Sequence, residues 1–102
     1  MKMIKVKNME NRVGKPVVNQ FIITEVSDYL KRTIFQSYNS IVATKVDDGD
    51  TYQIYLDKDT WDYSSTTGRY RNVFLGEDIH ETRKKIKSGE YKLVALNTDL
   101  MQ

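Results

Sequence analysis

Residues 41–56, IVATKVDDGDTYQIYL, decide the fold of this chain. Residues 41–46 and 51–56 are rich in β-branched and aromatic side chains, and the second run alternates between two sets of side chains as a strand does. Between the two runs lies the pair Asp48-Gly49, which favours a tight turn because both residues tolerate a positive φ. The segment therefore predicts a β-hairpin.

Three more strands are predicted upstream of this hairpin, at residues 3–7, 17–24 and 33–38. In the first of them, Ile4 and Val6 are expected to face the core while the residues between them face solvent. Residues 8–16 contain Asn, Gly and Pro, which indicate a loop. The polar residues 25–32 fit either a short helical turn or a hairpin loop.

Two helices and a closing strand are predicted after the hairpin. Ser65 or Thr66 is expected to cap the first helix, which Gly76 ends. Its apolar stripe consists of Tyr70, Val73 and Phe74. The second helix is expected over about 78–88, and the closing strand over 91–96. This order predicts an α+β fold, a mainly antiparallel sheet of about five to six strands with two short helices inserted before the last strand.

Length and composition limit the classes of protein that this chain fits. Its 102 residues correspond to one domain, expected over 1–96, with a loose tail at 97–102. The formal net charge of +2 does not indicate a nucleic-acid coat protein. The absence of cysteine excludes disulfides and thiolate metal sites and fits a cytoplasmic location. No run approaches the ~20 apolar residues of a membrane span, so no membrane partner is expected.

The densest cluster of hydrogen-bonding and stacking groups is residues 61–76, WDYSSTTGRYRNVFLG. Tyr, Trp and Arg dominate the hot spots of protein interfaces because they bury a large area and keep a polar group. We therefore expect a contact surface made of Trp61, Tyr63, Arg69, Tyr70 and Arg71. Burial of these side chains on both faces would make the cluster part of the core instead.

Four consecutive hydroxyl residues precede the first helix, at Ser64, Ser65, Thr66 and Thr67. Free N–H groups at a helix N-terminus attract anions, so this segment is a candidate site for a phosphate or carboxylate, either in a small-ligand-binding protein or in an enzyme. The alternative is that one hydroxyl caps the helix and the others are solvated. The glycine-rich loop and lysine of a nucleotide-binding P-loop are missing, and no cofactor is predicted.

The strongest basic run lies on the second helix, at Arg83, Lys84, Lys85 and Lys87. Together with Arg69 and Arg71 it would form a nucleic-acid-binding surface if the helices place these residues on one face. The alternative is a solvated helix, because acidic residues occupy its first turn and basic residues its last, as the helix dipole favours.

No residue pattern predicts catalysis or a metal site. The acidic residues around the hairpin do not match a calcium-binding loop, and Asp48 is better explained as a turn residue. His80 is the single histidine and is expected to be exposed on the second helix. The sequence has no Gly-x-Ser-x-Gly motif that would supply a nucleophilic serine for it to activate. We therefore expect a protein without enzymatic activity.

Several pieces of the sequence resemble a group of small uncharacterised proteins of tailed bacteriophages and related mobile elements. The pieces are NQFII at 19–23, FQSY at 35–38, WDYS at 61–64, TTGRYR at 66–71 and TRKKIKSGEYKL at 82–93. The resemblance implies an accessory protein in the cytoplasm of an infected bacterium that binds a host or defence-system protein, as in host takeover or counter-defence. Nucleic acid is the alternative partner, and an uncovered sheet edge would also permit a homo-oligomer.

Overall fold

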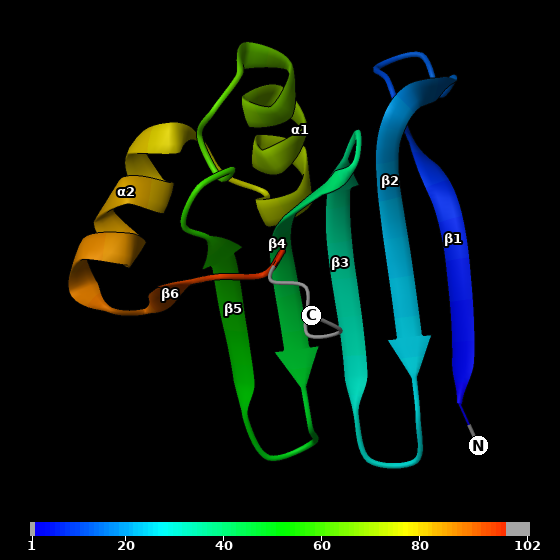
Figure 1. The fold of residues 1–102 in the computed structure, drawn as a ribbon, viewed down its shortest axis with the longest axis vertical. Coiled ribbons are helices and arrows are strands. Elements are labelled where there is room, and N and C mark those ends of the chain that lie inside the picture. The colour runs from blue at the N-terminus through cyan, green and yellow to red at the C-terminus, as the bar shows by residue number, and fades with distance from the viewer. Residues whose placement is uncertain (1, 98–102) are drawn as a thin grey trace.

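Six strands form a single sheet with two helices on one of its faces in the computed structural model, which describes residues 2–97 (Figure 1). The elements are β1 (Met3–Glu10), β2 (Pro16–Val26), β3 (Lys31–Ser37), β4 (Ser40–Asp47), β5 (Tyr52–Asp57), α1 (Ser65–Leu75), α2 (Ile79–Ser88) and β6 (Tyr91–Val94). The predicted α+β class, with a mainly antiparallel sheet and two helices before the last strand, is confirmed.

The strands follow one another across the sheet in chain order, from β1 at one edge to β6 at the other. The first five are joined by hairpins and pair antiparallel. β6 pairs parallel to β5, because α1 and α2 carry the chain back over one face before it re-enters the sheet. β1 therefore lies at the opposite edge of the sheet from β6, the strand that follows the two helices (Figure 1).

The hairpin of β4 and β5 forms as its Asp-Gly pair predicts. The Asp48 carboxylate accepts hydrogen bonds from the backbone N–H groups of Asp50 and Thr51, at 3.0 and 2.7 Å. Gly49 has a φ of 92°, which glycine adopts without a steric penalty. Asp48 is thus a turn residue, as expected from the sequence.

The core lies between α1 and the middle of the sheet. Ile22, Phe35, Ala43 and Leu56 are partners across β2, β3, β4 and β5 and therefore share one face. Phe74 of α1 packs on this face, with its ring centroid 5.8 Å from that of Phe35.

The expectation that Ile4 and Val6 face the core is wrong. Both side chains are exposed, at 59% and 62%, and they lie on the sheet face opposite to the helices. Alternation separated the two sets of β1 side chains correctly, but it does not tell which face receives the helices. The polar residues 25–32 are resolved as the end of β2, a hairpin loop and the start of β3.

Both helices have capped ends. Ser64, rather than Ser65 or Thr66, is the N-cap of α1, and Asp78 is the N-cap of α2. Gly76 and Gly89 end the helices in the left-handed conformation. Val73 of the predicted apolar stripe is exposed.

The segment after β6 is fixed to the sheet as far as it is described. The Asn97 side chain accepts a hydrogen bond from the Ile41 N–H at 2.7 Å and donates one to the Ile41 carbonyl at 2.9 Å. The rest of the predicted loose tail lies outside the described residues.

Candidate binding surfaces

Arg71 is a buried joint between α1 and the loop that follows β5. Its side chain is 2% exposed. The guanidinium donates to the Trp61 carbonyl at 2.7 Å and to the Asn72 side-chain oxygen at 3.0 Å, and it lies 3.3 Å from the Asp62 carboxylate. It also stacks over the Trp61 ring at 5.5 Å. These contacts hold the loop against the helix.

The five residues of the predicted contact surface differ in their exposure to solvent. Tyr70 and Arg71 are buried and cannot offer their side chains to a partner, which corrects their assignment to that surface. Trp61 is half-buried against the core. Of these five residues, only Arg69, on α1, and Tyr63, on the loop before it, are exposed. The density of aromatic and arginine residues in this stretch thus serves mainly the fold.

The hydroxyl run is largely used inside the protein. The Ser64 hydroxyl accepts the Thr67 N–H at 3.1 Å as the helix cap. Thr67 is buried, and its hydroxyl shares a hydrogen bond of 2.8 Å with Ser37 of β3. Ser65 and Thr66 are solvated. The capping role of one hydroxyl is confirmed, but Thr67 is buried rather than solvated, and an anion at this helix end would meet a serine that is already engaged.

Glu77 neutralises the centre of the basic run on α2. Its carboxylate accepts hydrogen bonds from Lys85 Nζ at 2.7 Å, Thr82 Oγ1 at 2.6 Å and Tyr91 Oη at 2.8 Å. Burial alone would raise the pKa of Glu77, but these donors outweigh it and lower the pKa below its ordinary value. The same contact raises the pKa of Lys85, and burial together with the carboxylate raises the pKa of Tyr91 to about 12.

Two more cations of the predicted nucleic-acid surface are also paired. Arg83 lies 3.5 Å from the Asp62 carboxylate, and Lys84 lies 3.4 Å from Glu81. Within residues 2–97, only Lys87 of this run has no carboxylate within ion-pair distance. Since Arg71 is buried as well, the two helices do not present the predicted set as one free basic face.

The acidic residues of the loops after β4 and β5 shape the backbone. Asp57 is almost completely buried, and its carboxylate accepts the N–H groups of Asp59, Thr60 and Leu96. Burial opposes its charge, but these hydrogen bonds lower the pKa of Asp57. Among the described residues, no three His, Cys, Asp or Glu side chains are grouped to hold a metal ion. His80 is exposed on α2, as expected.

Several cations without a carboxylate partner lie on the N-terminal hairpin, which comprises β1, β2 and the loop between them. In the part of the chain that the structure describes, none of its cations from Lys5 to Lys15 has a carboxylate partner; they are Lys5, Lys7, Arg12 and Lys15. Arg69 of α1, next to the loop, likewise has no carboxylate within ion-pair distance among the described residues. The hairpin cations are spaced along residues 5–15 and form no contiguous basic run by which sequence analysis could have found this surface.

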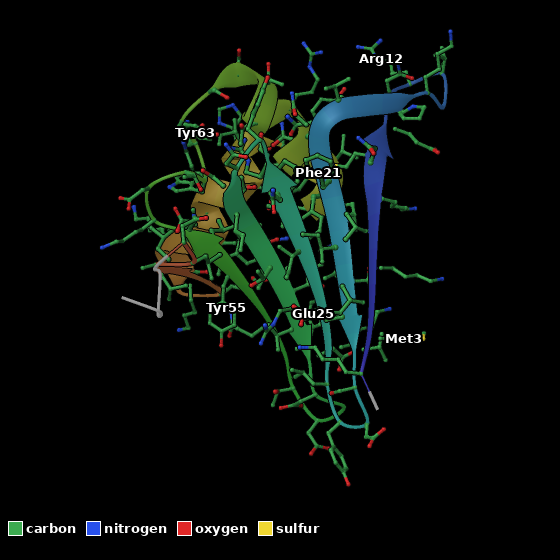
Figure 2. The ribbon with its side chains drawn as sticks, turned by 45° about the vertical axis from the view of Figure 1, so that its right-hand side comes forward. Met3, Arg12, Phe21, Glu25, Tyr55 and Tyr63 are labelled. Atoms are coloured by element: carbon green, nitrogen blue, oxygen red, sulfur yellow. The ribbon has the colours of Figure 1, made fainter. Side chains whose placement is uncertain are left out.

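The arginine groove lies between the hairpin loop and α1 and has a volume of about 460 Å³. It is lined by Glu10, Asn11, Arg12, Val13, Arg69, Tyr70 and Val73. The loop wall is fixed by Asn11, whose side-chain oxygen accepts the N–H groups of Val13 and Lys15, both at 3.0 Å. Figure 2 shows Arg12 on this loop, beyond the end of the sheet.

β1 forms an open edge of the sheet. The register places Ile4 and Val6 on the face that also carries Ile23 and Ile34, whereas Lys5 and Lys7 point to the helix side. Seven of its eight residues are exposed, and only Met9 is buried. Figure 2 shows side chains leaving this edge, from Met3 at its start, without another element beside them.

None of the described helices is both long enough and apolar enough to cross a membrane. Neither a curated protein nor a solved structure was found to match the chain. One family model matches residues 4–90, which include both helices, β2 to β5 and all of β1 except its first residue. The chain therefore belongs to DUF8033, a family of unknown function.

Proposed function

We propose that this chain is a non-enzymatic protein that docks on another protein through the open edge of β1. The observation that carries the proposal is the two-sided character of this strand. Ile4 and Val6 expose apolar surface on one face, and unpaired Lys5 and Lys7 lie on the other. An exposed strand edge presents backbone groups to which an extended segment of a partner can add.

The side chains of β1 indicate which kind of segment would bind to it. A strand with alternating apolar and acidic side chains would place the apolar set against Ile4 and Val6 and the acids against the lysines. Opposite charges across an interface raise the rate of association and reject wrong partners. The partner segment is therefore acidic and amphipathic.

Charge also disfavours pairing between two copies of the chain. Antiparallel pairing of two β1 strands centred on residue 5, 6 or 7 places a lysine of one copy opposite a lysine of the other, because side chains alternate with a period of two. Like charges directly opposite one another destabilise such a pair. The edge thus favours a different protein over a homo-oligomer.

The cellular context of the proposal comes from the resemblance to small phage and mobile-element proteins. It supports a host or defence-system protein as the partner, in the cytoplasm of an infected bacterium. Host takeover or counter-defence would follow from occupying a functional surface of that partner.

The test is capture of proteins by a tagged chain in parallel with an Ile4→Lys/Val6→Lys variant, followed by amide hydrogen exchange of the complex. Both side chains are exposed, so the variant is expected to fold. Tyr29→Lys, at an exposed position of the loop between β2 and β3, is the matched control. We expect the wild type and the control to bind one partner and to show protected β1 amides. Equal binding by the β1 variant, or protection elsewhere, would reject the proposal.

Nucleic acid remains the second candidate because of the unpaired cations of the N-terminal hairpin. Phosphate contacts release counterions, so binding must weaken steeply as salt rises. Lys5→Gln/Lys7→Gln should reduce this salt dependence, whereas Lys84→Gln/Lys85→Gln should not, since these two lysines already have carboxylate partners. Binding that is insensitive to salt excludes this candidate.

A further inference from the structure

We infer that the arginine groove binds carboxylates of an acidic, partly apolar peptide segment through Arg12 and Arg69. The inference rests on the proposed function, which it deepens by naming a second contact site and the chemistry of the segment that fills it. The groove lies at the end of the N-terminal hairpin, so one partner can contact both β1 and the groove.

The pairing of the arginines supports this site. The chain has five arginines. Arg32, Arg71 and Arg83 each lie within ion-pair distance of a carboxylate. Arg12 and Arg69 have no such partner among residues 2–97, and both line the same groove. The groove thus gathers the two guanidinium groups that the fold leaves unused.

The backbone that carries these two arginines is held in place before any ligand arrives. Asn11 fixes the loop of Arg12 through two hydrogen bonds to its N–H groups. The Ser64 cap and the Thr67–Ser37 hydrogen bond fix the turn of α1 from which Arg69 projects. A guanidinium presents parallel donors that match a carboxylate, and a preformed site loses less entropy on binding.

The other lining residues favour a peptide over nucleic acid. Val13 and Val73 are exposed, so they provide apolar surface beside the two cations. Tyr70 is buried, and no other aromatic side chain lines the groove to stack on a base. The Glu10 carboxylate would repel a continuous phosphate backbone, whereas a peptide can place an apolar or neutral residue beside it.

The experiment measures binding of a short labelled peptide that alternates Glu and Val, with amide chemical shifts of the protein to locate the site. We expect shifts at Arg12, Val13, Arg69 and Val73. Arg12→Gln and Arg69→Gln should each weaken binding about tenfold, since each removes one charge-assisted contact, and the double variant should lose it. Lys87→Gln, which removes an exposed and unpaired charge on α2, should change affinity less than about twofold.

Three comparisons distinguish the sources of the signal. A peptide with Gln in place of Glu should bind at least about tenfold more weakly; equal binding rejects a carboxylate site. Tighter binding of a short oligothymidine, or of inorganic phosphate, at the same residues would replace the peptide by nucleic acid or a small anion. No peptide binding to the wild type also overturns the inference.

The proposed function and this inference can fail separately. If Ile4→Lys/Val6→Lys abolishes capture of the partner while Arg12→Gln/Arg69→Gln leaves it unchanged, the docking strand stands and the groove is rejected. If the groove variant weakens capture and the β1 variant does not, the groove stands as a peptide site and docking on the strand edge is rejected.

Discussion

The helix α2 and the N-terminal hairpin both carry cations, but they use them in opposite ways. On α2, Lys85 is held by Glu77, and Lys84 lies beside Glu81. On β1, Lys5 and Lys7 face the neutral residues Thr24 and Ile22 across the hairpin. A basic run in a sequence is therefore a poor guide to free charge. What matters is whether the fold brings acids to the same place.

The difference follows from the local geometry of the two elements. On α2, Glu81 of the first turn lies three positions from Lys84 on the same helix face, whereas Glu77 reaches Lys85 from the turn before the helix. The side chains of a strand lie beside those of the neighbouring strand. The only acidic residue of β2 is Glu25, and it pairs with Lys2. The hairpin therefore leaves its remaining lysines for solvent or a partner.

The largest expected effect comes from breaking the charge network of α2. Glu77→Gln removes the carboxylate that Lys85, Thr82 and Tyr91 share, and we expect the free energy of unfolding to fall by about 3 kcal/mol. Urea unfolding at neutral pH measures this. Glu81→Gln is the control, because its contact with Lys84 is exposed and is expected to contribute less than about 1 kcal/mol.

The same variant tests the direction of the pKa shift. The pKa of Glu77 is lower in the folded than in the unfolded chain, so its contribution is complete above the unfolded value of 4.5 and is lost as pH falls through the folded value. Unfolding of the wild type should therefore become easier on acidification below pH 4.5, and Glu77→Gln should reduce this dependence. An unchanged acid dependence would contradict the network.

A buried and a free arginine of the same helix give the second comparison. Arg71→Met removes the hydrogen bond to the Trp61 carbonyl and the contact with Asp62, and we expect a loss of about 2 kcal/mol. Arg69→Met, at an exposed position two residues away, should change stability by less than about 0.5 kcal/mol. Thermal unfolding of both variants measures the two losses of stability. Equal losses would mean that Arg69 also has a structural role.

Much of the fold follows from local patterns in the sequence. Asp48-Gly49, Gly76 and Gly89 mark turns and helix ends because their backbone requirements are local. β1 ends at Glu10 rather than at residue 7, and the N-cap of α1 is Ser64 rather than Ser65 or Thr66. Alternation does not mark where a strand ends, and any residue in a run of hydroxyl side chains can serve as the cap. Local signals locate elements better than they locate their bounds.

The candidate site could be predicted less well, because exposure depends on the tertiary fold. Tyr70 and Arg71 have the residue types of an interface but face the core, and Val73 has the type of a core residue but lines the groove. The meeting of Arg12 with Arg69 requires the hairpin loop to lie against α1, and no spacing in the sequence encodes that contact. Which arginines remain without a carboxylate partner therefore depends on the tertiary fold.

The smallest expected effect lies in the N-terminal hairpin and sharpens its contrast with the helices. Gln20 of β2 is completely buried, and within residues 2–97 neither atom of its side-chain amide has a hydrogen-bond partner. An unpaired buried amide costs free energy, so Gln20→Leu is expected to raise the free energy of unfolding by about 1 kcal/mol. Gln53→Leu is the control, because that amide donates to the carbonyl groups of Ile54 and Glu90 and its loss should destabilise the chain. Urea unfolding distinguishes the two: if both variants lose stability equally, the Gln20 amide is as well paired in solution as that of Gln53, and the expected gain from Gln20→Leu is rejected.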